Sequence, residues 1–203
     1  QPGIIRDQLN DALRPHGVFF APSLSTSNRA TLGGMASTDA CGQGSRIYGR
    51  TSNHVLALQI ILADGEHLAC KPLPVAELEA YIAKGGRSAE LYRRVAHLVH
   101  EKASLITQVF PQLNRFMTGY NLAHIEQDKA FNLGALICGS EGTLAMVSEL
   151  TLRLTPIPKY KQLLALRYDS FDAALRDAKR LVELDPDAIE TIELEQLGVV
   201  ADA

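Results

Sequence analysis

Two segments rich in glycine and small hydroxyl side chains are the best candidates for chemistry in this 203-residue chain. The first runs from Thr31 to Gly42 and the second from Gly139 to Thr143. Glycines allow a ligand to approach main-chain N–H groups, and serine and threonine add hydroxyl donors. N–H groups at a turn or a helix start can bind an anion such as phosphate. Glycine is also common in ordinary turns, so each segment has a plain structural interpretation as well.

Sharper catalytic and metal-binding motifs are incomplete in this sequence. Gly42-Gln43-Gly44 is followed by Ile47 where a dinucleotide fingerprint needs its third glycine. Gly139-Ser140-Glu141-Gly142 is one residue short of a nucleophile elbow. His97 and His100 could share a helix face, but the His-Glu-x-x-His order and a clear third ligand are missing. No metal site is therefore predicted, and no side chain is a convincing general base.

Composition narrows the class of protein to a folded chain of one domain or slightly more. Twenty basic and 23 acidic side chains give a net charge of −3, and 46% of the residues are hydrophobic. A nucleic-acid binder would carry a basic face, and no apolar run is long enough for a membrane span. Three scattered cysteines give no disulfide framework, which predicts a cytoplasmic protein.

Regular elements are expected on both sides of the first glycine-rich segment. Apolar spacing predicts a helix over 4–13 and a strand over 18–20. Residues 22–53 are predicted to be irregular, because they are polar and contain few large apolar groups. Alternating apolar residues around Asp64-Gly65 then predict a β-hairpin that ends at Cys70.

The second glycine-rich segment is expected to follow a long helix and irregular chain. The helix is predicted over 88–110 with Ser88 as its cap, and 111–133 is predicted to be irregular. A tight turn over 138–143 precedes a strand over 150–154, and Ser140 could cap a short following helix. Pro156 and Pro158 mark a boundary, beyond which a strand at 164–166, a helix over 172–184 and a strand over 188–194 are expected.

In order, the two segments resemble one known pattern. The run Pro22…Ala30-Thr31-Leu32-Gly33-Gly34…Ser37-Thr38…Gly42…Tyr48-Gly49…His54-Val55-Leu56…Leu62-Ala63-Asp64-Gly65-Glu66 resembles the FAD-binding domain of the vanillyl-alcohol-oxidase (p-cresol-methylhydroxylase, PCMH) flavoproteins. Thr118-Gly119-Tyr120-Asn121-Leu122 and Gly139-Ser140-Glu141-Gly142-Thr143-Leu144 are similar to the second signature of the branch that oxidises D-2-hydroxy acids. Within it, the chain resembles long bacterial FAD-linked oxidases similar to D-2-hydroxyglutarate dehydrogenases.

The resemblance implies an α+β fold and a set of FAD-binding residues. Residues 1–158 would be the second half of a PCMH-type FAD-binding domain, mostly antiparallel sheet with flanking helices, and 159–203 the start of an α+β substrate domain. The missing initiator methionine fits an excised piece, expected to bind FAD weakly and to have little activity alone. The residues that the resemblance assigns to the cofactor are Pro22, Ser23, Thr31, Gly33, Gly34, Ser37, Thr38, Cys41, Gly42, Val55, Gly139, Ser140, Glu141, Gly142 and Thr143.

The implied activity of the intact protein is hydride transfer from a D-2-hydroxy acid to the flavin. An iron–sulfur cluster and a metal would lie outside these residues, and homodimerisation through an exposed apolar patch is an expected assembly. Two positions depart from the family pattern: Asp39 stands where the family often has a neutral residue, and Ala145 where it often has a glycine. The carboxylate of Asp39 near a phosphate would be unfavourable unless it faces away. Two alternatives remain: a non-catalytic α+β interaction module, or a flavin reductase of the same fold that acts on a nucleotide sugar.

Overall fold

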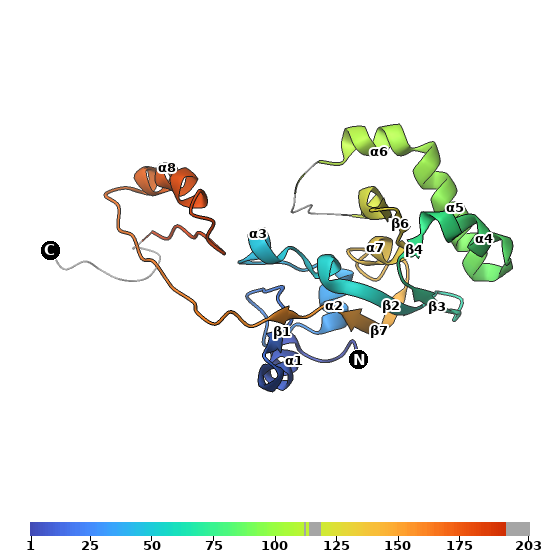
Figure 1. Cartoon of the computed structure of the whole chain (residues 1–203), viewed down its shortest axis with the longest axis horizontal. Coiled ribbons are helices and arrows are strands. Elements are labelled where there is room, and N and C mark those ends of the chain that lie inside the picture. Colours follow the sequence, from blue (N-terminus) through green and yellow to red (C-terminus); the bar gives the residue numbers. More distant parts are fainter. Residues whose placement is uncertain (112, 114–118, 194–203) are drawn as a thin grey trace.

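The chain folds into small antiparallel sheets with most of the helices around them and the last helix apart (Figure 1). The computed structural model describes residues 1–111, 113 and 119–193. Its helices are α1 (Arg6–Leu13), α2 (Leu32–Ser37), α3 (Ser45–Tyr48), α4 (Val75–Ala83), α5 (Gly86–Glu101), α6 (Ala103–Val109), α7 (Leu133–Ile137) and α8 (Phe171–Val182), with 3₁₀ turns η1 (Arg14–His16), η2 (Thr51–His54) and η3 (Leu122–His124). Its strands are β1 (Val18–Phe19), β2 (Val55–Ile61), β3 (His67–Cys70), β4 (Leu73–Pro74), β5 (Glu126–Gln127), β6 (Ala130–Phe131), β7 (Met146–Leu152) and β8 (Thr155–Pro156). The expected α+β class is confirmed.

A three-stranded sheet in the order β3-β2-β7 is the centre of the fold. All its pairings are antiparallel, and Leu58 of β2 lies opposite both Cys70 and Leu150. The predicted hairpin is confirmed, with Gly65 in the left-handed region (φ +83°). The predicted strand over 150–154 lies partly in β7, which begins earlier and ends at Leu152. Two further small sheets have the strand orders β1-β8 and β4-β6-β5.

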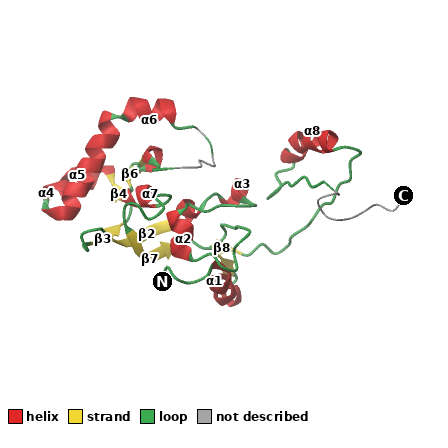
Figure 2. Ribbon diagram, turned by 180° about the vertical axis from the view of Figure 1, so that it is seen from behind, coloured by secondary structure: helices red, strands yellow, loops and turns green. Residues whose placement is uncertain are grey.

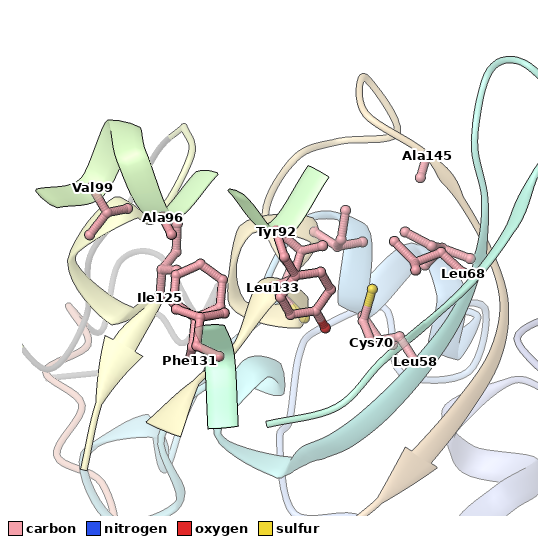
Figure 3. Close-up of a cluster of buried hydrophobic side chains, with 14 of the residues drawn as sticks. Leu58, Leu68, Cys70, Tyr92, Ala96, Val99, Ile125, Phe131, Leu133 and Ala145 are labelled. Carbon is pink, nitrogen blue, oxygen red and sulfur yellow. The ribbon is translucent and has the colours of Figure 1, made fainter. Parts of the chain in front are cut away.

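The main hydrophobic core lies between the sheets and the helices α4 and α5. Tyr92 of α5 faces Phe131 of β6, with ring centroids 5.7 Å apart, and Figure 3 shows both beside Leu133. Phe131 and Ile125 are fully buried. A second core joins α1 and α2 through Phe20, and its members are Phe20, Leu32 and Met35, with Ile4, Leu9, Leu150 and Leu152 packed against them. Since Leu150 contacts both cores, α2 is held against the central sheet.

Several predicted elements differ from the observed ones. The expected helix over 88–110 is two helices, because the chain leaves α-helical geometry at Lys102 (φ −100°, ψ +12°). Ser88 lies inside α5, whose N-cap is Gly85, and α4 was not predicted. Residues 22–53 contain three short helical segments rather than irregular chain alone. Ser140 caps no helix, since turns and then β7 follow it.

Beyond β8 the chain runs without helix or strand from 157 to 170 and then forms α8, apart from the sheets (Figure 2). The predicted helix over 172–184 is confirmed with slightly different ends. The strand expected at 164–166 is absent, because no described strand lies beside it to share its hydrogen bonds. Residues 188–193 form no strand either, and residue 194 lies outside the described part. Apolar side chains are correspondingly exposed, among them Leu163, Leu164, Leu175 and Leu184.

Candidate functional site

The first glycine-rich segment folds into α2, whose start is closed by the chain itself. The Thr31 side chain caps the helix by accepting a hydrogen bond from the N–H of Gly34 at 3.2 Å. The N–H groups of Leu32 and Gly33 donate to the carbonyls of Ile4 and Pro2, at 3.0 and 2.8 Å. The N–H groups that would attract an anion at a helix start are therefore engaged by protein oxygens.

The second glycine-rich segment docks on the other end of α2. Gly139 donates its N–H to the carbonyl of Ala36 at 3.0 Å, and Glu141 donates its N–H to the carbonyl of Ser37 at 2.8 Å. Within the loop, Thr143 donates both its N–H and its hydroxyl to the carbonyl of Ser140, at 3.0 and 2.6 Å. The two segments that sequence analysis singled out, about a hundred residues apart, are thus joined directly.

A surface hollow of about 310 Å³ lies where the two segments meet. We call it the α2–β7 hollow, and it is lined by Gly33, Ser37, Gly142, Ala145, Met146 and Val147. Its lining combines Ser37 and two glycines with the apolar residues Ala145, Met146 and Val147. Its volume is within the range of small-molecule sites but holds only part of a large cofactor.

Three of the predicted site residues line this hollow, seven more shape the two segments beside it, and the rest lie elsewhere. Gly33, Ser37 and Gly142 line it directly. Thr31, Gly34 and Thr38 form hydrogen bonds inside α2, and Gly139, Ser140, Glu141 and Thr143 shape the second loop. Cys41 is half-buried with a free thiol. Sequence analysis named Ala145 only as a departure from the family pattern and missed Met146 and Val147, because their contribution depends on where β7 starts.

Pro22, Ser23 and Gly42 lie together at a close crossing of two main-chain segments. The Ser23 hydroxyl donates to the carbonyl of Gln43. A Cβ added at Gly42 would lie 2.4 Å from the carbonyl oxygen of Ser23. Pro22 is fully buried, and its carbonyl accepts a hydrogen bond from the Arg6 guanidinium at 2.9 Å. In this part of the chain, glycine is required for packing of protein on protein.

Val55 lies away from the hollow, at a second and smaller cavity. This cavity has a volume of about 100 Å³ and a mainly polar lining that includes Arg50, Asn121, His124 and Asn132. The Nδ1 of His124 lies 2.7 Å from the amide oxygen of Asn121, so Nδ1 carries the hydrogen. Burial and the nearby Arg50 guanidinium lower the pKa of His124, which favours the neutral ring at pH 7.

Asp39 and Arg50 form a buried ion pair that sequence analysis did not predict. The Arg50 guanidinium lies 3.1 Å from the Asp39 carboxylate, and the two side chains are 5% and 10% exposed. The same carboxylate accepts hydrogen bonds from the N–H and the hydroxyl of Ser52, at 2.8 and 3.0 Å. The negative charge that stood out in the sequence is thus neutralised inside the protein. Ala145 lines the hollow without a left-handed φ, so the missing glycine does not strain this turn.

The remaining candidates for chemistry form local pairs on the surface. His97 lies 3.6 Å from Glu101, and His100 lies 2.7 Å from Glu126. Among the described residues, no three histidine, cysteine or acidic side chains are grouped to hold a metal ion. No described helix has the length and apolarity needed to cross a membrane. Thr118 of the second signature lies outside the described residues, whereas Tyr120 contacts the Thr143 hydroxyl at 2.9 Å.

Comparisons with known proteins agree with these features. Residues 1–71 match the sequence family described as FAD binding domain. The chain is 51% identical over 194 residues, 95% of its length, to a D-2-hydroxyglutarate dehydrogenase of Pseudomonas putida. It is 46% identical over 201 residues, 98% of its length, to the enzyme of the same name from Escherichia coli. A glycolate oxidase subunit GlcD of Bacillus subtilis is 25% identical over 204 residues, which is 100% of this chain and 33% of that protein.

The chain spans only about a fifth of the length of the D-2-hydroxyglutarate dehydrogenases that it matches, with 19% of the Pseudomonas protein and 20% of the Escherichia protein covered. The identity extends over nearly all of this chain, including both glycine-rich segments. These matches confirm the resemblance to FAD-linked oxidases of the D-2-hydroxyglutarate dehydrogenase type, with the FAD-binding-domain sequence in residues 1–71.

Proposed function

We propose that the α2–β7 hollow holds part of an FAD molecule. The observation that carries this proposal is the direct joining of the two glycine-rich segments at one hollow, through the hydrogen bonds of Gly139 and Glu141 to the end of α2. The match of residues 1–71 to an FAD binding domain identifies the ligand class. A hollow lined by both polar and apolar residues suits a cofactor that has both diphosphate and ring portions.

The hollow offers uncharged hydrogen-bond donors to this cofactor. The Ser37 hydroxyl and the N–H of Gly142 have no hydrogen-bond partner among the described residues, so both can donate to a ligand. Gly142 has φ +77° and no atom within 4 Å of an added Cβ, which leaves its main chain open to a ligand. The α2 start supplies no free N–H, so we assign the polar contacts to Ser37 and Gly142. At Gly33 the space of a side chain is taken by Pro2, so this residue offers only its main chain to the hollow.

For the whole protein, we propose that FAD oxidises a D-2-hydroxy acid, with D-2-hydroxyglutarate as the first substrate to test. Support comes from the D-2-hydroxyglutarate dehydrogenases that are 46–51% identical to this chain over 95–98% of its length. When bound, FAD would accept the hydride, while Met146, Val147 and Ala145 would shield part of it from water. We further propose a boundary near 158, with 1–158 as part of the FAD-binding domain and 159–203 as the beginning of a substrate domain.

Blocking the hollow tests the cofactor proposal. The 203-residue chain is titrated with FAD, FMN and AMP, and binding is followed by flavin fluorescence and by competition. We expect weak FAD binding that Ser37→Phe reduces by at least about tenfold, equivalent to about 1.4 kcal/mol. The matched control is Ser45→Phe, a half-buried serine at the start of α3 outside the hollow.

The result separates the possible outcomes clearly. Equal FAD affinity for Ser37→Phe and Ser45→Phe would place the cofactor elsewhere on the chain. No binding of FAD, FMN or AMP at millimolar concentration would refute binding by these residues. The activity proposal is tested in the longer polypeptide that contains this chain, with an artificial electron acceptor and both enantiomers of 2-hydroxyglutarate. Oxidation of the L-enantiomer alone would contradict it.

A further inference from the structure

The second residue after α2, which follows the C-cap Thr38, has a backbone conformation that normally belongs to glycine. Asp39 has φ +46°, in the left-handed region. Its N–H donates to the carbonyl of Ala36 at 3.1 Å, and the N–H of Ala40 donates to the carbonyl of Met35 at 2.9 Å. These two bonds define a Schellman motif, in which glycine is the usual residue at this position. A side chain is kept here in spite of the backbone preference, which points to a role for the carboxylate.

The Asp39 carboxylate joins the end of α2 to η2. It accepts from Arg50 at 3.1 Å and from the N–H and hydroxyl of Ser52 at 2.8 and 3.0 Å. Close by, the N–H of Thr51 donates to the carbonyl of Ala40 at 3.0 Å. Since Asp39 and Arg50 are both almost fully buried, removing either partner would leave the other charge buried beside fewer partners.

The second glycine-rich loop contacts the same corner. Gly139 and Asp39 both donate their N–H groups to the carbonyl of Ala36. An added Cβ on Gly139 would lie 3.5 Å from the Cβ of Asp39, which is ordinary van der Waals contact. The loop continues to Gly142, which lines the α2–β7 hollow. A shift of Asp39 would therefore move the support on which this loop lies.

We propose that Asp39 and Arg50 are positioning residues of the cofactor site. Their ion pair fixes the end of α2 against η2, and this corner in turn holds the Gly139–Thr143 loop in place over the hollow. Neither residue lines the hollow, so each acts through the loop rather than on the ligand. The identity of the ligand as FAD rests on the proposed function above; the positioning of the loop does not.

Three substitutions separate the backbone from the charge. Asp39→Gly relieves the left-handed backbone but removes the carboxylate. Asp39→Asn tolerates the same backbone and can still accept from Ser52, but it removes the negative charge. Arg50→Lys keeps the positive charge and loses the planar fork. The matched control is Asp128→Gly, another left-handed aspartate (φ +52°), exposed and outside the hollow.

The first measurement needs no cofactor: hydrogen exchange of the Gly139 and Glu141 amides, in variants shown by circular dichroism to be folded. We expect both amides to exchange at least about tenfold faster in Asp39→Asn and Asp39→Gly than in the wild type, equivalent to about 1.4 kcal/mol. Arg50→Lys should produce a smaller increase. Asp128→Gly should leave both rates unchanged.

The second measurement is FAD affinity in the same variants. A loss of about tenfold for Asp39→Asn, with none for Asp128→Gly, supports positioning of the cofactor site. Unchanged amide exchange at Gly139 and Glu141 overturns the proposal whatever the FAD affinity. Faster exchange with unchanged FAD affinity also overturns it, since the pair would then be structural only. If the wild type binds no FAD but exchange is faster in the Asp39 variants, loop positioning is supported and the proposed function fails.

Discussion

The glycines of the first segment differ in what a methyl group would meet, and alanine substitution should expose the difference. In Gly42→Ala the new Cβ would lie 2.4 Å from the Ser23 carbonyl oxygen and 3.1 Å from the Leu24 Cα, both main-chain atoms. Gly42 has no left-handed φ, so the cost comes from contact alone. Overpacking costs about 1–3 kcal/mol, and each kcal/mol lowers the Tm of a chain of this length by about 2–4 °C. We therefore expect a fall of about 2–12 °C in thermal denaturation.

Two other glycines calibrate this prediction. At Gly3 an added Cβ has no atom within 4 Å, so Gly3→Ala should leave the Tm unchanged or raise it slightly. At Gly33 the Cβ would lie 2.9 Å from the Pro2 ring Cβ and 3.3 Å from the Pro2 carbonyl oxygen, which is less close than the contact at Gly42, and alanine favours the α2 helix. Gly33→Ala should fall between the other two. A Tm for Gly42→Ala within about 1 °C of that for Gly3→Ala would refute the packing argument.

Two further predictions concern the α2 cap and the buried thiols. Thr31→Ala should lower the free energy of unfolding by about 0.5–2 kcal/mol in urea denaturation, because it removes the hydroxyl that accepts the N–H of Gly34. Thr31→Ser keeps a hydroxyl and should retain most of the wild-type stability. Equal losses in both variants would contradict this reasoning. Burial raises the pKa values of Cys70 and Cys138 from 9.0 to about 12. Both thiols stay protonated in the folded chain, whereas in the unfolded chain they ionise near their usual pKa, so the free energy of unfolding should fall as the pH rises from about 9 through 12. At pH 8 only Cys41 of the three cysteines should react with a thiol reagent in the native chain. Rapid labelling of Cys70 or Cys138 would count against this prediction.

The sequence was a good guide wherever the pattern is local. The hairpin around Gly65 follows from alternating apolar residues and a turn dipeptide, both of which act within a few residues. The strand expected at 164–166 fails because a strand also needs a neighbour, which no local pattern supplies. The break at Lys102 was missed for a similar reason, since apolar spacing continues through it. Partners that come from distant segments, such as Gly139 for the carbonyl of Ala36, are set by tertiary structure alone.

The glycine-rich segments illustrate how one composition can serve two purposes. At Gly42 the absent side chain makes room for another protein segment, whereas Gly142 has open space beside it and a left-handed φ. The N–H groups at the start of α2 are engaged by Ile4, Pro2 and the Thr31 side chain. The first segment therefore mainly forms contacts within the protein, and the second supplies main-chain groups that are open to a ligand. A ligand binds most readily to polar groups that have no partner within the protein. Substitutions around Gly142 and Ser37 should therefore affect ligand affinity more than stability, whereas substitutions around Gly42 should affect stability more than affinity.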